Sequence, residues 1–534
     1  MTHPGDIADA VVIGAGPNGL VAANLLADAG WSVVVLEAAD EPGGSVRSGE
    51  VTEPGFRTDF CSAFYPLSAV SPFMTALDLE QHGLSWRHAP DVLAHVLPDD
   101  RVALVSRDVD RTAESVAQFA ERDGDAWRAE FGTWQHIRDD LMDALFRPFP
   151  PIRAAGRLFR RMGTGDALRF ARRAVMPVRA LANELFEGEG AQLLYAGNAL
   201  HSDLGPDTAG SSIFGWLLAM LAQDVGFPAP AGGAGEITAA LVRRLESLGG
   251  RVDCGRRVDR VLIARGTAVG VRDTTGELVR ARKAVLADVP APSLYLELVG
   301  AEHLPSRMVD DLSRFHWDDS TVKVDWALSG PVPWTAKEAA GAGTVHLGGD
   351  LNGLARFSSQ LSCGQTPKVP FLLLGQMTTT DPSRSPRGTE SVWAYTHVPR
   401  GQKWDASRLQ RAAERIEQTI EKHAPGFSSK VIARHVAGPE ELGRHNISLV
   451  DGAVNGGTAA IHQQLIFRPT PGLARPDTPV DRLYLASASA HPGGAVHGGP
   501  GGTAAHVALL RNGFAGGAYR ALIAATLSRI TADR

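Results

Sequence analysis

Cysteine is scarce in this chain of 534 residues, which contains only Cys61, Cys254 and Cys363. No CxxC pair occurs, which argues against a thioredoxin-type redox disulfide and a cysteine-ligated zinc site. Neither HExxH nor another paired metal-ligand spacing is present, so we expect no metal site. The low cysteine content also fits a reducing compartment, and a cytoplasmic location is predicted.

Long apolar runs and an excess of positive charge are absent as well. The longest apolar run, near Ile213 to Ala222, is about half of what a membrane span needs. The N-terminal ten residues contain two Asp and no Lys or Arg, unlike the basic start of a signal peptide. The 53 basic and 59 acidic side chains leave a formal charge of −6, so nucleic acid is not an expected partner.

Glycine, in contrast, is abundant, and its first cluster predicts a nucleotide site. Residues 9–37 indicate a buried strand, a tight turn, a helix ended by Gly30 and a second strand. Gly14 permits the turn, Gly16 lets the backbone approach a pyrophosphate, and Gly19 allows close packing of helix and strand. The helix N-terminus adds free N–H groups and a positive dipole end. The GxGxxG turn reads Gly14-Ala15-Gly16-Pro17-Asn18-Gly19.

The residues after this turn favour FAD over NAD. Glu37 ends the second strand, where a carboxylate can accept hydrogen bonds from ribose hydroxyls. Gly43-Gly44 and Arg47 follow closely, which is typical of FAD proteins of the glutathione-reductase structural class. An ordinary surface turn is the alternative for the glycine pair. Gly233-Ala234-Gly235 follows no clear strand, so a separate NAD(P)H domain is not expected.

A second glycine cluster lies near the C-terminus. A strand at residues 483–486 runs into a glycine-rich loop and then into a helix from Thr503 to about Leu510. This order again places backbone N–H groups and a positive helix end beside a cofactor. His491 and His497 are candidates for proton transfer there. The alternative is that His491 shapes the turn before a proline and that His497 caps or packs against the loop.

Together these motifs resemble the phytoene-desaturase-like branch of the FAD-dependent amine-oxidase superfamily, and within it the subgroup named after the pyridine nucleotide-disulfide oxidoreductase domain. The resemblance covers nearly the whole chain and includes the turn Asp381-Pro382-Ser383. It implies that Val258 lies against the adenine, with an ordinary core valine as the alternative. In the C-terminal loop the residues assigned to FAD are Ser489, His491, Pro492, Gly493, Gly494 and Val496.

One departure from the amine-oxidase pattern bears on the substrate. Amine oxidases usually carry an acid at the position of Ala488, bonded to the ribityl chain of the flavin. Alanine instead matches the carotenoid-desaturase pattern, which argues against an amino-acid or polyamine oxidase.

The predicted fold is α/β, with a Rossmann-like FAD-binding domain assembled from discontinuous segments. We expect this domain to comprise residues 1–90, 226–300 and 441–534. A helical lid insertion is expected at residues 91–225, and a sheet-based substrate domain at residues 301–440.

The stretch Phe146–Arg179 within the insertion is strongly basic. It contains nine Arg and one acid, Asp166, with apolar residues interleaved. Basic amphipathic segments of this kind can lie at a membrane surface, so peripheral membrane association is one interpretation. A solvated helical face or a salt-bridged lid is the other.

These observations predict an FAD-dependent oxidoreductase that dehydrogenates an apolar or lipid-like small molecule, with FAD accepting a hydride. The motifs single out no catalytic acid or base, because the cofactor carries the electron transfer in such chemistry. The alternatives are a redox-neutral isomerase or saturase that uses reduced FAD, and a flavin-bound regulatory protein with little turnover. The expected electron acceptor is oxygen, a quinone or another carrier rather than NAD(P)+.

Overall fold

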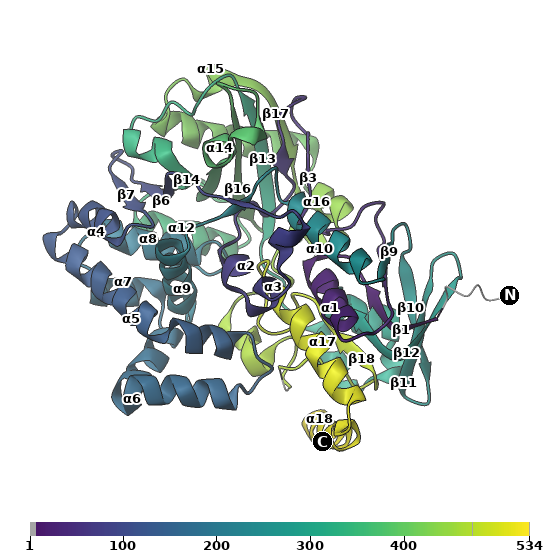
Figure 1. Cartoon of the computed structure of the whole chain (residues 1–534). Helices are drawn as coiled ribbons and strands as arrows, with labels where there is room; N and C mark the ends of the chain where they lie inside the picture. The colour runs from purple at the N-terminus through teal and green to yellow at the C-terminus, as the bar shows by residue number, and fades with distance from the viewer. Residues whose placement is uncertain (1–6, 473, 533–534) are drawn as a thin grey trace.

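The computed structural model describes residues 7–472 and 474–532. Two seven-stranded sheets and a layer of helices make up the molecule. Figure 1 shows the first sheet beside the N-terminus, the second sheet above it, and the helices of residues 109–224 along the opposite side. This arrangement confirms the predicted α/β fold.

The first sheet combines strands from three separate parts of the chain. Its order is β10-β11-β12-β1-β2-β9, and β18 pairs with the end of β12. Neighbouring strands from β12 to β9 run parallel, as do β12 and β18, whereas β10, β11 and β12 form an antiparallel meander. The bounds are β1 Ile7–Ile13, β2 Val33–Leu36, β9 Arg251–Asp253, β10 Val258–Ala264, β11 Thr267–Asp273, β12 Leu278–Ala287 and β18 Leu483–Leu485.

Three helices cover one face of this sheet, with α1 (Pro17–Asp28) packed against α10 (Gly235–Ser247) and α17 (Gly499–Asn512). Proline in the first turn of α1 suits a position whose N–H has no partner within the helix. The N-cap Gly16 has no side chain to cap α1, and the Gly19 N–H donates to Asp288 Oδ2. Among the first three residues of the helix, this leaves the N–H of Asn18 for a ligand.

The second sheet has the order β17-β13-β16-β15-β14-β6-β7. Neighbouring strands are antiparallel except β14 and β6. Alternate residues such as Val322, Val324 and Trp326 form a core with α14 (Ala406–His423), whose N-cap is Asp405. The bounds are β6 Asp91–Val96, β7 Val102–Val105, β13 Ser320–Leu328, β14 Ala342–Leu347, β15 Leu372–Gln376, β16 Glu390–Val398 and β17 Val431–Ala437.

The structure differs from the expected boundary at residue 91. Strands β6 and β7 extend the second sheet, so residues 91–105 belong with the substrate domain by hydrogen bonding. Both strands are buried; β6 pairs with β14 at the edge of the second sheet, and β7 pairs with β6. The helical layer starts after them, with α4 Val109–Ala117, α5 Glu121–Leu145, α6 Ile152–Val175, α7 Val178–Leu185, α8 Glu189–Ala199 and α9 Ser211–Asp224.

Helix α6 carries most of the basic stretch, and seven of the nine arginines in that stretch form ion pairs. Arg157 and Arg161 both contact Asp140 of α5, and Arg173 contacts Glu130. The remaining four pairs are Arg147–Asp143, Arg169–Asp166, Arg172–Glu184 and Arg179–Asp207. The acids that compensate the basic stretch thus come largely from neighbouring elements. Within residues 7–472 and 474–532, no helix is long and apolar enough to cross a membrane.

Candidate functional site

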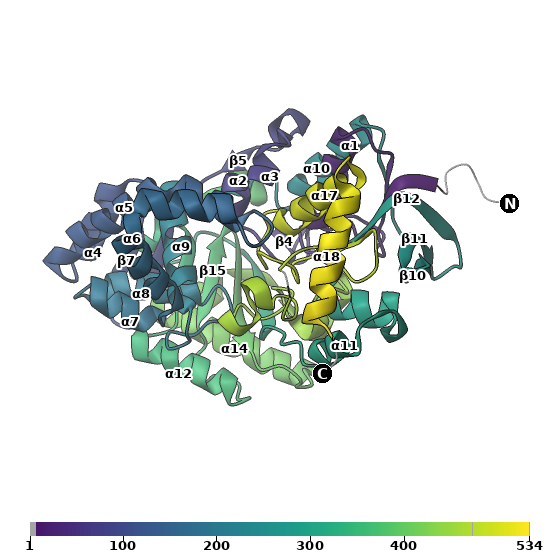
Figure 2. The same ribbon diagram turned by 90° about the horizontal axis from the view of Figure 1, so that it is seen from below.

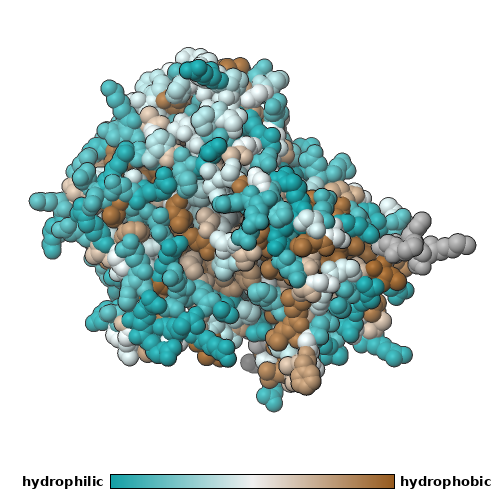
Figure 3. Space-filling view, viewed as in Figure 1, coloured by the Kyte–Doolittle hydropathy of each residue, from teal (hydrophilic) through white to brown (hydrophobic). Residues whose placement is uncertain are grey.

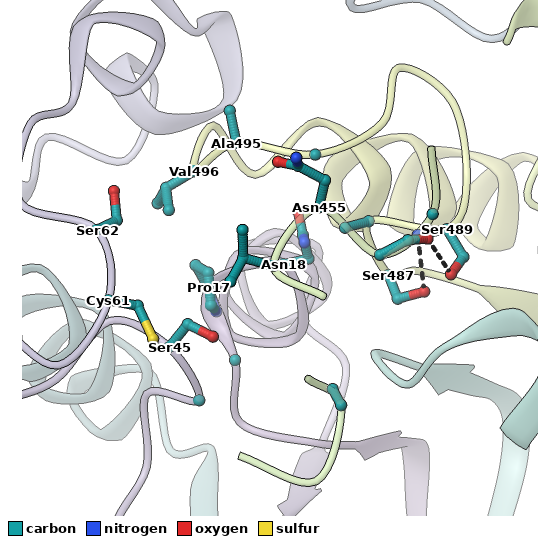
Figure 4. A pocket seen from close by; sticks show the side chains of 18 of the residues that line it. Pro17, Asn18, Ser45, Cys61, Ser62, Asn455, Ser487, Ser489, Ala495 and Val496 are labelled. Carbon is teal, nitrogen blue, oxygen red and sulfur yellow. Dashed lines mark hydrogen bonds between the residues drawn. The ribbon is translucent and has the colours of Figure 1, made fainter. Parts of the chain in front are cut away.

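A cavity of about 890 Å³ runs between the first sheet, the second sheet and α9. Its volume lies in the range of small-molecule and cofactor sites. Figure 4 shows that side chains from the start of α1, from residues 45–62 and from residues 487–496 surround one space. Segments far apart in the sequence therefore form a single site at the carboxyl ends of the parallel strands, where ligands of such sheets bind.

The GxGxxG turn forms one end of this cavity, and its three glycines are needed for different reasons. Gly14 has φ +92°, a conformation that side chains disfavour. A Cβ on Gly16 would lie 2.5 Å from Asp288 Oδ2, and one on Gly19 would lie 2.1 Å from the carbonyl oxygen of Gly14. Gly14, Gly16, Pro17 and Asn18 line the cavity, whereas Gly19 lies behind them in the helix–strand contact.

Asp288, directly after β12, is a site residue that the sequence motifs do not reveal. Its Oδ2 accepts a hydrogen bond of 2.8 Å from the Gly19 N–H beneath the turn. Burial, reinforced by the nearby charge of Glu37, raises the pKa of Asp288 to about 7. The signal in the sequence is an acid directly after the apolar strand 284–287, which becomes meaningful only once β12 is seen to lie beside β1.

The raised pKa of Asp288 predicts a pH-dependent stability. Because the folded state holds this proton more tightly than the unfolded state does, folding stability falls as pH rises from about 4 to about 7. Asp288→Asn keeps an acceptor for Gly19 but cannot ionise, so we expect its melting temperature to fall less than that of the wild type between pH 5 and pH 8. Parallel melting curves for the two proteins would contradict this assignment.

Glu37 lies at the end of β2 and lines the cavity, as its predicted role requires. Its two carboxylate oxygens accept hydrogen bonds from Ala15 N and Ala39 N, which fix the side chain beside the turn. Gly44 also lines the cavity, while Gly43 lies just outside it. Arg47 points elsewhere, because its guanidinium donates to the carbonyl oxygens of Gly44 and His445.

The C-terminal loop closes the opposite side of the same space. Ser489, His491, Pro492, Gly494 and Val496 line it, and Gly493 does not. Val258, expected beside the adenine, lines it from the start of β10. Of the sixteen residues that the sequence assigns to FAD binding, all but four line this one cavity; the exceptions are Gly19, Gly43, Arg47 and Gly493. Their contacts with FAD itself stay predictions.

The two histidines of this loop differ in what they can do. His497 Nδ1 accepts from the Gly499 N–H, and its Nε2 bonds to the Gly494 carbonyl oxygen, so both ring nitrogens hold the loop. Burial lowers the pKa of His497 to about 4, which keeps it neutral in that role. His491 faces the cavity, and burial together with the charge of Arg468 lowers its pKa to about 4. The geometry therefore favours the loop-capping role for His497.

A buried polar clamp of Asp318 and Arg468 holds the loop 454–459 against the cavity. Asp318 accepts from the N–H groups of Val454, Asn455 and Gly457. Arg468 donates to the carbonyl oxygens of Thr458 and Ala488, and so joins this loop to the C-terminal one. Because Arg468 bonds to both the loop 454–459 and the C-terminal loop, the two loops are held in fixed positions relative to each other.

One charged pair lies in the wall formed by the second sheet. Lys323, which lines the cavity, contacts the carboxylate of Asp325 two residues along β13, and both residues are 3% exposed. Successive side chains of a strand point to opposite faces of the sheet, so Lys323 and Asp325 lie on the face opposite to the core under α14. The ammonium group of Lys323 lies beside the cavity, and the carboxylate of Asp325 balances its charge.

The fold and the site define a two-domain nucleotide-binding flavoenzyme. A parallel sheet carries a glycine-rich turn on the N-terminus of α1, an acid at the end of β2 and a second glycine-rich loop that enters α17. The cradle fits FAD, because the bare backbone of Gly14 and Gly16 lines the cavity beside the N-terminus of α1, and the Glu37 carboxylate lines it at the end of β2. Gly14, Gly16, Glu37 and Gly44 would hold the nucleotide half.

The chain belongs to the flavin containing amine oxidoreductase family, whose model matches residues 18–499. It is 28% identical to pyridine nucleotide-disulfide oxidoreductase domain-containing protein 2 of Rattus norvegicus, over 93% of each chain. It is 26% identical to the neurosporene-forming phytoene desaturase of Cereibacter sphaeroides, over 92% of each. An oxidoreductase structure from Methanosarcina mazei superposes with a TM-score of 0.62 at 16% identity, covering 94% of this chain and 99% of that one. The protein is therefore an FAD-dependent oxidoreductase of this family that resembles phytoene desaturases over nearly its whole length.

Proposed function

We propose that this oxidoreductase dehydrogenates an apolar, lipid-like substrate and leaves a carbon–carbon double bond. The observation that supports it most is the cavity wall beyond the FAD cradle, where α9 contributes only apolar side chains. These are Ile213, Phe214, Leu217, Leu218 and Leu221. Relatives named phytoene desaturases also fit this substrate class.

The chain's own residues position the substrate and exclude water. Bound FAD supplies a two-electron acceptor for hydride. Apolar packing along α9 favours an extended hydrocarbon segment and disfavours water beside it. Ala488 lies in the wall without a carboxylate, so this loop offers no anionic partner for a substrate ammonium group. Each substrate molecule loses one hydride, which leaves with its electron pair, and one proton from the adjacent carbon, whose C–H electron pair stays behind as the second bond of the new double bond.

Anaerobic mixing with lipid fractions tests this reaction. We expect one fraction to bleach the flavin and to yield a product lighter by two hydrogens in mass spectrometry. A product of unchanged mass would indicate an isomerase, and one heavier by two hydrogens would indicate a saturase; either result would overturn the proposal. Failure of every lipid fraction to bleach the flavin would favour a binding protein with little turnover.

NADH and NADPH are not expected to reduce the flavin rapidly. The glycine-rich loop before α10 already uses its backbone donors inside the protein: Gly232 N donates to Asp381, Ala234 N to Asp59 and Gly235 N to Ser48. It therefore has no N–H groups left there to hold a second pyrophosphate. Stopped-flow mixing without oxygen should show slow, non-saturating bleaching by either nucleotide. Rapid bleaching that saturates at micromolar concentration would contradict this expectation.

We also propose that the cavity opens toward a lipid surface. Val175, Ile461 and Leu465 line the cavity and are 52%, 39% and 46% exposed, so they mark its opening. Exposed apolar residues continue along α6 and around α18 (Gly516–Ile530); both helices lie at the bottom of Figure 1 and are seen from below in Figure 2. Figure 3 shows apolar residues gathered over α17 and α18 on the face in view. Because most α6 arginines are paired, apolar insertion contributes more than charge.

Liposome flotation checks this orientation. Replacing Ile152, Phe159 and Leu168 of α6 with Ser should weaken flotation, because these side chains are 75%, 47% and 65% exposed and would enter the lipid. The matched control is Ile432→Ser on β17, an exposed apolar residue at the opposite end of the molecule in Figure 1. Equal flotation of both variants and the wild type would argue against docking through α6.

A further inference from the structure

The face of the second sheet that meets the cavity is polar, in contrast to α9 across from it. The strand register places Lys323 beside Tyr395, Tyr395 beside Leu373, and Leu373 beside His346 in one row. Lys323, Leu373 and Tyr395 line the cavity. A substrate lying between the sheet and α9 therefore meets one polar and one apolar surface.

His201, just after α8, extends this polar surface. It lines the cavity, and its Nε2 lies 2.8 Å from His346 Nε2. Burial lowers the pKa of His201 to about 3 and holds that of His346 well below its usual value, so both rings are neutral. One nitrogen of this contact donates and the other accepts, which fixes both rings. His201 Nδ1 has no hydrogen-bond partner among the residues that the structure describes.

Three further polar atoms in the same wall lack partners within the described chain. They are Asn198 Oδ1, Thr321 Oγ1 and Thr344 Oγ1, in residues that are 1%, 4% and 1% exposed and line the cavity. Buried polar groups are almost always hydrogen-bonded, because leaving them unpaired costs free energy. Such atoms are spread along this wall, with Thr321 on β13 and Thr344 on β14, and they indicate a ligand that carries polar groups.

We propose that the part of this wall around His346, where Asn198, His201 and Tyr395 line the cavity, binds a neutral oxygen of the substrate. The substrate is then an apolar molecule that carries a carbonyl or hydroxyl group, and a pure hydrocarbon is a poor ligand. A carboxylate or phosphate does not match the site, because the two imidazoles are neutral and Asp325 already neutralises Lys323. This inference rests on the proposed function, since it assigns the same cavity to the substrate.

Matched ligands of one chain length test this site directly. The FAD-bound protein is titrated with undecan-2-one, undecan-2-ol and undecane, and each affinity is taken from the perturbation of the flavin absorbance. Comparing variant with wild type for each probe cancels differences in probe hydration. We expect His201→Leu to weaken the ketone and the alcohol by about tenfold or more, and undecane by less than about twofold.

Two variants and one control separate hydrogen bonding from damage to the cavity. Tyr395→Phe removes only a hydroxyl and should produce the same selective loss, and His201→Gln should restore part of it. Leu218→Ala, on the apolar wall, should weaken all three probes by similar factors. The inference is overturned if His201→Leu and Tyr395→Phe leave the ratio of ketone to alkane affinity unchanged. Binding does not require turnover, so an unchanged ratio would contradict the oxygen site and leave the proposed dehydrogenation untouched. In the reverse case, selective binding of the oxygenated probes without flavin reduction by any oxygenated lipid would count against dehydrogenation alone.

Discussion

Gly16→Val should yield a folded protein that purifies without FAD. Gly16 has φ −68° and ψ 171°, which valine adopts readily, so backbone strain contributes little. Its Cβ, however, would lie 2.5 Å from Asp288 Oδ2, so a branched side chain would force Asp288 and the glycine turn apart. The backbone could then no longer approach a pyrophosphate. We expect flavin absorbance to fall from stoichiometric to undetectable, with circular dichroism unchanged.

The matched control for this substitution is Gly132→Val on α5. A Cβ there meets no atom within 4 Å, so the same chemical change should leave FAD content as in the wild type. Stoichiometric FAD in Gly16→Val, released intact on denaturation, would contradict the placement of the pyrophosphate. Loss of FAD from both variants would point instead to a general effect on folding.

The sequence was most informative where one short segment contains the whole pattern. Residues 9–37 encode a strand, turn, helix and strand whose contacts are local, and the structure has β1, α1 and β2 there. The helix α14 is similarly local, because its cap Asp405 and its buried face lie within one continuous segment. The assignment of β6 and β7 to the second sheet was not predictable, because their partner β14 lies more than 200 residues away and alternation alone does not name a partner.

The same physical reason explains which site residues the sequence did not reveal. Asp288 joins the site through the pairing of β12 with β1, and Asp318 acts through backbone groups of another segment. Such contacts leave no spacing rule in the sequence. Arg47 is the opposite case: it occupies the position that the sequence pattern gives to an FAD-binding arginine, but its guanidinium donates to the carbonyl oxygen of His445.

Arg384→Leu should cause a large loss of stability, because it breaks an ion pair that is completely buried. Arg384 Nη2 donates to Asp59 Oδ2 at 2.8 Å, and both side chains are 0% exposed. Asp59 Oδ1 also accepts from Ala234 N and from Ser48 Oγ. One carboxylate thus joins β4 (Thr58–Asp59), the loop before α10, and η5 (Pro382–Arg384) of the substrate domain.

Removing the guanidinium leaves this carboxylate buried and short of its charge partner, which costs about 3–5 kcal/mol of unfolding free energy. The matched control is Arg314→Leu, whose ion pair with Asp310 is exposed and should cost about 0–1 kcal/mol. Urea unfolding of the two variants and of Arg384→Leu combined with Asp59→Leu measures the effect. The double variant should be less destabilised than the sum of the two single changes, because no charge is left unpaired. Similar midpoints for Arg384→Leu and Arg314→Leu would show that the buried pair does not hold the two domains together.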